Sequence, residues 1–326
     1  MSNILNHLYR YLLDMNFELR HLRYFLAVAD TGHMTRAAAT LGIQQPPLSM
    51  QIRALEAIVG MKLFHRRSRG MELTEGGQLF LNDALRIVND VERVQQRMHR
   101  IARGEEGVLE VGFTSSAASH AFTPCALQAC RKHFPSLRLQ LSEDNAAELI
   151  AALASSRLHC AILRRPVARP AGIVFEVLFR EPVMVALPKE HHLVAKNNRA
   201  QSALSITDLR EEGLILVRRP GAPGMYADLI ALCESHGFQP KIAAEVDRMM
   251  TNLNLVAAGA GVSVVPASMQ GIQAHAVAYC PLADGSSLDA PITMAWREED
   301  YAGGTKVFVE LMRLIAKPYQ RLSVAL

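Results

Sequence analysis

Residues 33 to 49, His-Met-Thr-Arg-Ala-Ala-Ala-Thr-Leu-Gly-Ile-Gln-Gln-Pro-Pro-Leu-Ser, decide the first part of the fold. The three alanines at positions 37 to 39 let another helix approach closely at little cost in side-chain entropy. Gly42 is typical of the residue after a helix, and the pair Pro46-Pro47 suits a first helical turn, where a missing N–H costs least. The stretch therefore predicts a short helix, a tight turn and the start of a second helix.

Apolar residues on both sides extend this pair to three helices. Residues that mark a preceding helix recur at helical spacing: Leu19, Leu22, Leu26 and Ala29. Residues at steps of four, three and four mark the buried face of the third helix: Leu48, Ile52, Leu55 and Val59. Residues 63 to 73 then form a pattern of two short strands around a basic tip. This order predicts a winged helix-turn-helix domain at residues 17 to 73, with the third helix as the reader of DNA.

The charge of this region suits a polyanion. Residues 17 to 73 hold eight Lys and Arg against four Asp and Glu, a net charge of +4, which equals the net charge of the whole chain. Such local excess is the electrostatic footprint of nucleic-acid binding. A small helical bundle with a solvated basic loop remains the alternative.

Length and composition favour a multidomain globular protein. The chain has 326 residues, of which half are hydrophobic and a fifth charged, which suggests two or three domains. No run of eighteen apolar residues and no secretory signal is visible, so we expect a cytoplasmic protein with no membrane partner.

Cysteine and histidine patterns predict neither a metal site nor a cofactor. The five cysteines are scattered without a Cys-x-x-Cys pair, which argues against disulfides and zinc. A redox pair of Cys125 and Cys130 is a minor alternative. The twelve histidines, including His191-His192, show no metal-binding spacing.

A long helix should follow the wing. Thr74 is a good N-cap, and apolar residues then recur with a 3.5-residue period: Phe80, Ala84, Ile87, Val91, Val94, Met98 and Ile101. We expect a coiled coil in a homodimer over residues 74 to 107, with Gly104 to Gly107 as a hinge. A single amphipathic helix that packs on its own domain is the alternative.

The remaining residues alternate between strand and helix patterns. Strands at 108–113, 137–141 and 158–163, separated by a helix from Thr114 to about Phe134 and a helix at 146–156, predict a parallel sheet, and a second series begins with a strand at 182–187. This alternation predicts two α/β lobes, lobe I at 108–181 and 286–326 and lobe II at 182–285, with a ligand cleft between them. Ser115 and Ser116 lie at a predicted helix start, where hydroxyl and N–H groups could hold a carboxylate, although plain N-capping is an equal alternative.

Two other function classes fit less well. A solute-binding receptor shares the two lobes but lacks a reading helix. An enzyme is not expected, because no nucleophile elbow, metal spacing or phosphate loop is present in the right context.

The motifs as a whole resemble the LysR-type transcriptional regulators, from Phe17 to about Ala316. Matching segments in the DNA-binding region are Leu22-Arg23-Tyr24-Phe25, Thr35-Arg36-Ala37-Ala38, Gln45-Pro46-Pro47-Leu48-Ser49, Gln51-Ile52, Leu55-Glu56, Leu63-Phe64-His65-Arg66 and Leu73-Thr74. Residues 1 to 16 are then an N-terminal extension, or translation begins at Met15. Segments of the second lobe, such as Leu255-Val-Ala-Ala-Gly259, look most similar to the branch that responds to aromatic acids and muconate.

The resemblance implies a fold and a set of partners. The fold is α/β, with an N-terminal winged helix-turn-helix, a long dimerisation helix and two Rossmann-like effector lobes of the periplasmic-binding-protein type. The implied partners are double-stranded promoter DNA, a small organic anion as effector, further copies in a homodimer or homotetramer, and RNA polymerase. The effector would rearrange the DNA-binding pairs through the hinge near Gly104.

The resemblance also implies site residues. Those carried over for DNA binding are Thr35, Arg36, Gln45, Pro46, Ser49, Met50, Arg53, Arg66 and Arg69. Met50 departs from the branch, in which arginine is common, so it cannot make a bidentate contact to guanine but could touch a thymine methyl group.

The effector residues are assigned in the same way. Ser116 matches a ligand-contacting serine and Arg164 a cleft arginine, while Asn145-Ala146 replaces the frequent Gly-Thr. The loop of lobe II would contribute Arg218, Arg219, Pro220, Gly221 and Met225. Its two arginines favour an anion, with surface solvation as an equal alternative.

Overall fold

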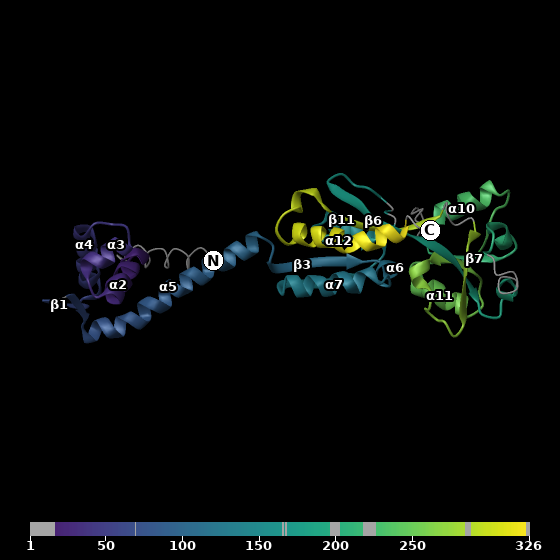
Figure 1. Ribbon diagram of the computed structural model, residues 1–326. Coiled ribbons are helices and arrows are strands. Elements are labelled where there is room, and N and C mark those ends of the chain that lie inside the picture. The colour runs from purple at the N-terminus through teal and green to yellow at the C-terminus, as the bar shows by residue number, and fades with distance from the viewer. Residues whose placement is uncertain are drawn as a thin grey trace, which may run out of the picture. The chain divides into compact units, whose positions relative to one another are not determined.

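The computed structural model describes residues 17–68, 70–164, 166, 168–195, 203–217, 226–283 and 288–323 (Figure 1). The chain divides into two compact units, Met1–His99 and Arg100–Leu326. None of the helices in the described ranges has the length and apolar character that a membrane span requires.

The first unit is a winged helix-turn-helix, as predicted. Its helices are α2 (Leu19–Thr31), α3 (Met34–Thr40), α4 (Gln45–Val59) and α5 (Glu75–Ala102). Its wing consists of the antiparallel strands β1 (Phe64–Arg67) and β2 (Gly70–Leu73). Prolines occupy the first turn of α4, and Gly60 ends that helix in the left-handed conformation, φ 73°. The local signals in the sequence therefore set both ends of the reading helix.

The core of this unit joins all its elements. Leu48, Ile52 and Leu55 of α4 are buried with Phe25 of α2, and Ala84 of α5 packs into the same cluster. Phe25 also contacts the ring of Phe64 at the start of the wing, with ring centroids 5.2 Å apart. The predicted apolar face of α4 is thus the face that packs.

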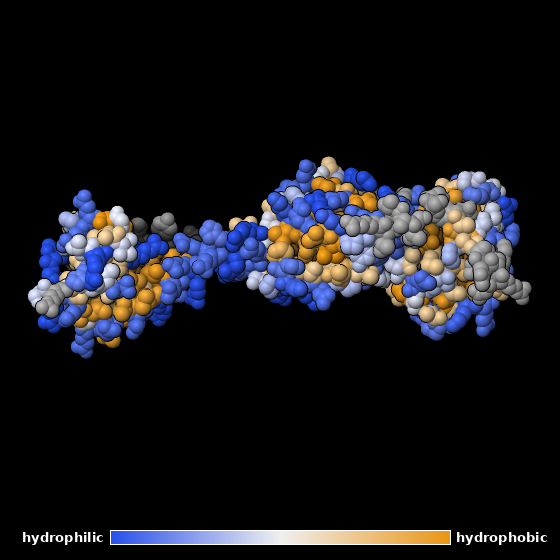
Figure 2. Space-filling view, in the orientation of Figure 1, coloured by the Kyte–Doolittle hydropathy of each residue, from blue (hydrophilic) through white to orange (hydrophobic). Residues whose placement is uncertain are grey.

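Helix α5 carries two apolar stripes rather than one. Ala84 and Val88 are buried against the three-helix core, so the alternative of a helix packed on its own domain holds for its first half. The predicted heptad residues Ile87, Val94 and Met98 are 37, 59 and 51% exposed in the single chain. Figure 2 shows hydrophobic surface along the first half of α5. The second stripe is therefore available to a partner helix.

Helix α5 ends before a left-handed glycine. Gly104 has φ 74°, and a Cβ built on it would lie 2.1 Å from the carbonyl carbon of Gly303. A side chain is thus excluded there by backbone conformation and by contact. The first strand of the second unit begins two residues later, at Glu106.

Lobe I is a sheet with helices on both faces (Figure 1). Its strands are β3 (Glu106–Phe113), β4 (Ser136–Glu143), β5 (Cys160–Leu163), the first half of β6 (Ile173–Pro188) and β11 (Asp289–Arg297). Its helices are α6 (Ser115–Ala118), α7 (Phe122–His133), α8 (Ala146–Ala154) and α12 (Gly303–Ser323). Helices α7 and α12 share one core with β3, and α8 packs in a second cluster on the other face. Strands β3, β4 and β5 run parallel, as the alternating pattern predicted.

Lobe II repeats this plan around the second half of β6. Its strands are β7 (Gly213–Val217), β8 (Lys241–Val246), β9 (Ser263–Pro266) and β10 (Val277–Pro281). Its helices are α10 (Tyr226–Ser235) and α11 (Met249–Ala257), with short 3-10 turns at Ile206–Leu209 and Ala267–Met269. Helices α10 and α11 belong to separate apolar clusters on either side of the strands. A further 3-10 turn, Glu298–Asp300, follows β11.

Strand β6 belongs to both lobes. It pairs with β11 as far as Pro182, and from Val183 onward it pairs with β9 and β10. One continuous strand therefore crosses the boundary between the lobes.

Two details of lobe I differ from the sequence prediction. A single helix was expected from Thr114 to about Phe134, but the chain turns between α6 and α7. Pro124 explains the break, because its missing N–H is tolerated in the first turn of α7 and not in the middle of a longer helix. The first half of β6 and strand β10 were not predicted.

Candidate nucleic-acid interface and effector site

The first three turns of α4 present a mostly polar face to solvent. Gln45, Pro46, Met50 and Arg53 are exposed, and Ser49 is half-buried. The side chain of Met50 is 66% exposed, although methionine is most often buried. These residues can reach base edges without any change in the core of the domain.

Contacts with α3 and the wing fix this surface. The hydroxyl of Thr35 donates to Oε1 of Gln45 at 3.3 Å, and the guanidinium of Arg66 donates to Oγ of Ser49 at 3.4 Å. Arg36 is exposed and donates to the carbonyl oxygen of Thr31 at 2.7 Å, which ties α3 to the end of α2. Arg69 lies outside the described residues.

A small hollow separates the reading helix from the wing. It has a volume of about 250 Å³, and its lining includes Ser49, Arg53 and Arg66. Within the described residues neither arginine makes an ion pair, whereas Arg67 pairs with Glu72 at 2.9 Å. Neither guanidinium is neutralised by a carboxylate of the described residues, so both charges are available to phosphate oxygens at the edge of the reading face.

Glu56 is a functional residue that sequence reasoning missed. Its carboxylate is buried and accepts hydrogen bonds from the amides of Leu63 and Phe64, at 3.0 and 3.4 Å, and from Nζ of Lys62 at 2.7 Å. It thereby joins the wing to α4. The sequence held one signal of this burial, because Glu56 follows Ile52 by four residues and therefore lies on the buried face of α4.

Ser115 and Ser116, predicted to bind the effector, lie in the short helix α6, whose first residues have hydroxyl groups without hydrogen-bond partners among the described residues. Thr114, the N-cap of α6, makes no capping bond with its side chain, and its buried Oγ1 has no partner among the described residues. The hydroxyls of Ser115 and Ser116 likewise make no hydrogen bond within the described part of the chain. Three hydroxyls and the first N–H groups of α6 therefore gather at the end of β3.

Arg164 is committed to an internal network. It is 7% exposed, and its Nη1 lies 2.5 Å from Oε1 of Glu181. Its Nη2 donates to the carbonyl oxygen of Ser116 at 2.7 Å and to Oγ of Ser268 at 3.0 Å. The side chain thus connects α6 and β6 with the turn after β9 in lobe II. Its Nε is buried and has no hydrogen-bond partner among the described residues, while the contact of Arg164 with an effector stays a prediction.

A buried histidine lies next to this network. The ring of His120 packs at an angle against the rings of Phe179 and Tyr319, with centroids 4.9 and 5.3 Å away. Burial lowers its pKa from the usual value, the nearby carboxylate of Glu181 opposes that shift and Arg164 adds to it. The ring therefore stays neutral near pH 7, and its Nδ1 accepts the amide of Phe122 at 2.9 Å.

Asn145 and Ala146 lie at the start of α8. Oδ1 of Asn145 accepts the amides of Ala147 and Glu148, both at 3.1 Å. In this structure Asn145 is an N-cap that satisfies the helix terminus, while its contact with an effector stays a prediction. The remaining effector residues predicted from sequence, Arg218, Arg219, Pro220, Gly221 and Met225, lie outside the described residues.

Comparison with known proteins identifies both units. The model of the bacterial regulatory helix-turn-helix protein of the lysR family matches residues 19–78, and that of the LysR substrate binding domain matches residues 102–314. The second match alone spans more than half of the chain, so the family is established over both units.

Individual relatives are similar over most of their length. The uncharacterized HTH-type transcriptional regulator YnfL of Escherichia coli is 38% identical over 83% of this chain and 89% of its own. The HTH-type transcriptional regulator BenM of Acinetobacter baylyi is 34% identical over 86% of this chain and 90% of its own. The crystal structure of CbnR, a LysR family transcriptional regulator, has a TM-score of 0.76 at 31% identity and covers 91% of this chain and 100% of its own.

These matches confirm the fold class and exclude the enzyme alternative, because the relatives are transcriptional regulators. With its winged helix-turn-helix and its two-lobed substrate-binding domain, the chain belongs to the LysR family of DNA-binding transcriptional regulators.

Proposed function

We propose that this regulator reads promoter DNA through Gln45, Ser49, Met50 and Arg53 of α4 and holds the phosphate backbone with Arg66. The observation that carries this proposal is the exposed, mostly polar face of α4 beside two cations without a described ion pair. A second crystal structure shows full-length CbnR in complex with its target DNA, and this chain is similar to it with a TM-score of 0.72. Its likeness supports the same use of the domain here.

The assembly we propose is a homodimer or homotetramer. The heptad residues Ile87, Val94, Met98 and Ile101 are between 37 and 59% exposed in the single chain. Pairing of two α5 helices would remove these apolar groups from water and hold two reading helices at a fixed separation, as two half-sites require.

The effector we propose is a small organic anion, with a carboxylate or an aromatic acid as the favoured class. The unpartnered hydroxyl of Thr114 and the free hydroxyls of Ser115 and Ser116 supply donors, and the first turn of α6 adds N–H groups. The resemblance of segments such as Leu255-Val-Ala-Ala-Gly259 to the branch that responds to aromatic acids supports the aromatic class. Contact with RNA polymerase stays a prediction from the family.

The test separates specific from nonspecific binding. Gln45→Ala and Ser49→Ala should weaken binding to the regulated promoter by about 1 to 3 kcal/mol and leave binding to random duplex nearly unchanged. Gln78→Ala, an exposed glutamine on α5, is the matched control. Fluorescence anisotropy with both duplexes at fixed salt measures the difference.

Two outcomes would contradict the proposal. Equal losses on both duplexes would show that these side chains do not read bases. A wild-type chain that binds an organic acid but neither duplex at low salt would instead favour the alternative, a receptor-like protein without a transcriptional role.

A further inference from the structure

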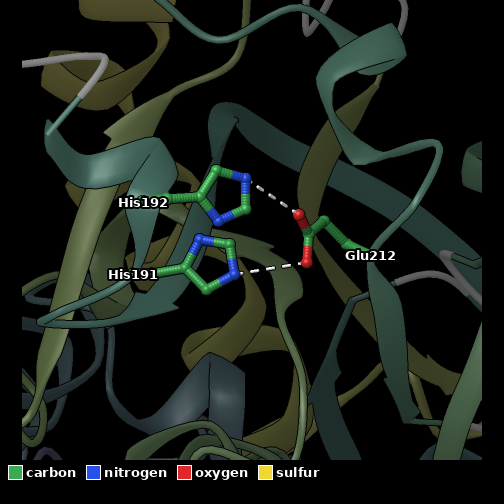
Figure 3. Close-up of side chains that lie close together, drawn as sticks. All are labelled: His191, His192 and Glu212. Atoms are coloured by element: carbon green, nitrogen blue, oxygen red, sulfur yellow. Dashed lines mark hydrogen bonds and ion pairs between the residues drawn. The ribbon is translucent and has the colours of Figure 1, made fainter.

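Three side chains outside both sites converge in lobe II. Nε2 of His191 lies 3.2 Å from Oε2 of Glu212, and Nε2 of His192 lies 3.4 Å from Oε1 of the same carboxylate. Figure 3 shows both imidazole rings directed toward Glu212. The rings stack at a centroid distance of 4.4 Å and an angle of 32°.

The backbone holds these side chains at two turns. The amide of His191 donates to the carbonyl oxygen of Pro188 at 2.9 Å, which closes a turn directly after β6. The amide of Glu212 donates to the carbonyl oxygen of Leu209 at 3.1 Å, just before β7 begins. The side chains of His191 and Glu212 are each 16% exposed, and that of His192 is 71% exposed. The cluster is therefore fixed by the fold on one side and open to water on the other.

We infer that His191, His192 and Glu212 form a binding site for a divalent transition metal of the Zn²⁺ class. The donor atoms of the three residues all lie within 4.8 Å of one another. Ligands about 2.0 to 2.2 Å from a tetrahedral zinc ion lie roughly 3.3 to 3.6 Å apart, close to the two N···O distances observed here. Small side-chain rotations are enough to place an ion between them.

The ligand chemistry selects the class of ion. Imidazole nitrogen suits zinc, copper, nickel and iron, whereas magnesium and calcium prefer sites made of oxygen alone. Three protein ligands leave at least one position for water, which the exposed side of His192 can supply.

Coordination has a small cost at His191. Its Nδ1 accepts the amide of Leu193 at 3.3 Å, so this nitrogen carries a lone pair. A metal at Nε2 requires the ring proton on Nδ1, and this long hydrogen bond would be lost. The loss is modest beside the gain from a metal–imidazole bond.

The sequence shows no metal-binding spacing here because Glu212 lies 21 residues after His191. The carboxylate reaches the two rings because the folded lobe places the turn before β7 beside the turn after β6. The ion would link these two segments of lobe II.

The experiment uses the full-length chain without an affinity tag, stripped with a chelator and dialysed. Titration with ZnCl₂ in a calorimeter should show one ion per chain. His192→Ala and Glu212→Gln should each weaken binding by at least about 10- to 100-fold, since even the loss of an outer partner of a metal ligand has that effect. His275→Ala, an exposed histidine of the same lobe, is the control and should bind as the wild type does.

A second readout uses Co²⁺, whose visible absorption changes when nitrogen ligands bind. Thermal melting in metal-free buffer establishes that each variant is folded. The inference is overturned if the wild type binds no Zn²⁺, in which case the cluster is a hydrogen-bonded pair of imidazoles on a carboxylate. Binding that persists at full strength in both His192→Ala and Glu212→Gln overturns it as well.

Discussion

Replacement of Glu56 by alanine tests how the wing is attached to the reading helix. The carboxylate accepts from the amides of Leu63 and Phe64, at 3.0 and 3.4 Å. A buried donor left without a partner costs about 1 to 3 kcal/mol. With one good and one long hydrogen bond lost, Glu56→Ala should destabilise the wing by roughly 2 to 4 kcal/mol.

Two variants divide this effect into its causes. Glu56→Gln keeps an oxygen acceptor and should cost about half as much. Lys62→Ala removes only the ion pair to Glu56, in which the lysine side chain is 73% exposed. Exposed pairs are worth at most about 1 kcal/mol, so this variant should resemble the wild type.

Hydrogen–deuterium exchange measures the result at the amides concerned. A loss of 2 to 4 kcal/mol corresponds to roughly 30- to 700-fold faster exchange of the segment that holds Leu63 and Phe64. Promoter affinity should fall in parallel, because Arg66 would lose its place beside Ser49. Exchange in Glu56→Ala no faster than in Lys62→Ala would refute the argument that the buried carboxylate holds the wing.

Further predictions concern the effector, DNA, pH and thiol chemistry. Ser116→Ala should reduce the rise in Tm that an organic acid effector gives, measured by scanning fluorimetry, and an unchanged rise would move the site elsewhere. Arg66→Ala should weaken promoter and random DNA alike and lower the slope of log K against log salt by about 1; an unaltered slope would contradict a phosphate contact. Because burial lowers the pKa of His120, the unfolded chain binds its proton more readily, so stability should fall as pH drops below about 6.5. Urea titrations should show a smaller fall for His120→Gln. Burial raises the pKa of the Cys130 thiol, whereas Cys125 is exposed, so a maleimide should react first at Cys125 and Cys125→Ser should lose that fast reaction.

The DNA-binding unit was largely predictable because its signals are local. The proline pair before Leu48, the glycine after Val59 and the apolar periodicity of α4 all concern neighbours within a few turns. The same holds for the parallel strands of lobe I. Glu56 was missed because its partners, Leu63 and Phe64, exist only once the chain has turned back into the wing.

Long-range pairing explains the other differences. The first half of β6 carries the charged residues Glu176 and Arg180, which are not typical of a buried strand. Glu176 forms an ion pair with Arg313, and Arg180 forms one with Asp289. Arg164 was predicted to be a cleft residue, but its internal network was not foreseen, because its partner Ser268 lies 104 positions away. The first two pairs form only when β6 packs against β11 and α12 within lobe I, and the third forms only where the two lobes meet, so no local pattern reports any of them.

A strand shared by two sheets restricts how far lobes I and II can separate. Backbone hydrogen bonds hold β6 to β11 on one side of Pro182 and to β9 and β10 on the other. Any motion of one lobe relative to the other must therefore twist strand β6, because no flexible loop joins the lobes at this point. A biosensor built from this regulator should accordingly carry orientation-sensitive probes on the two lobes, because closure would change their angle more than their separation.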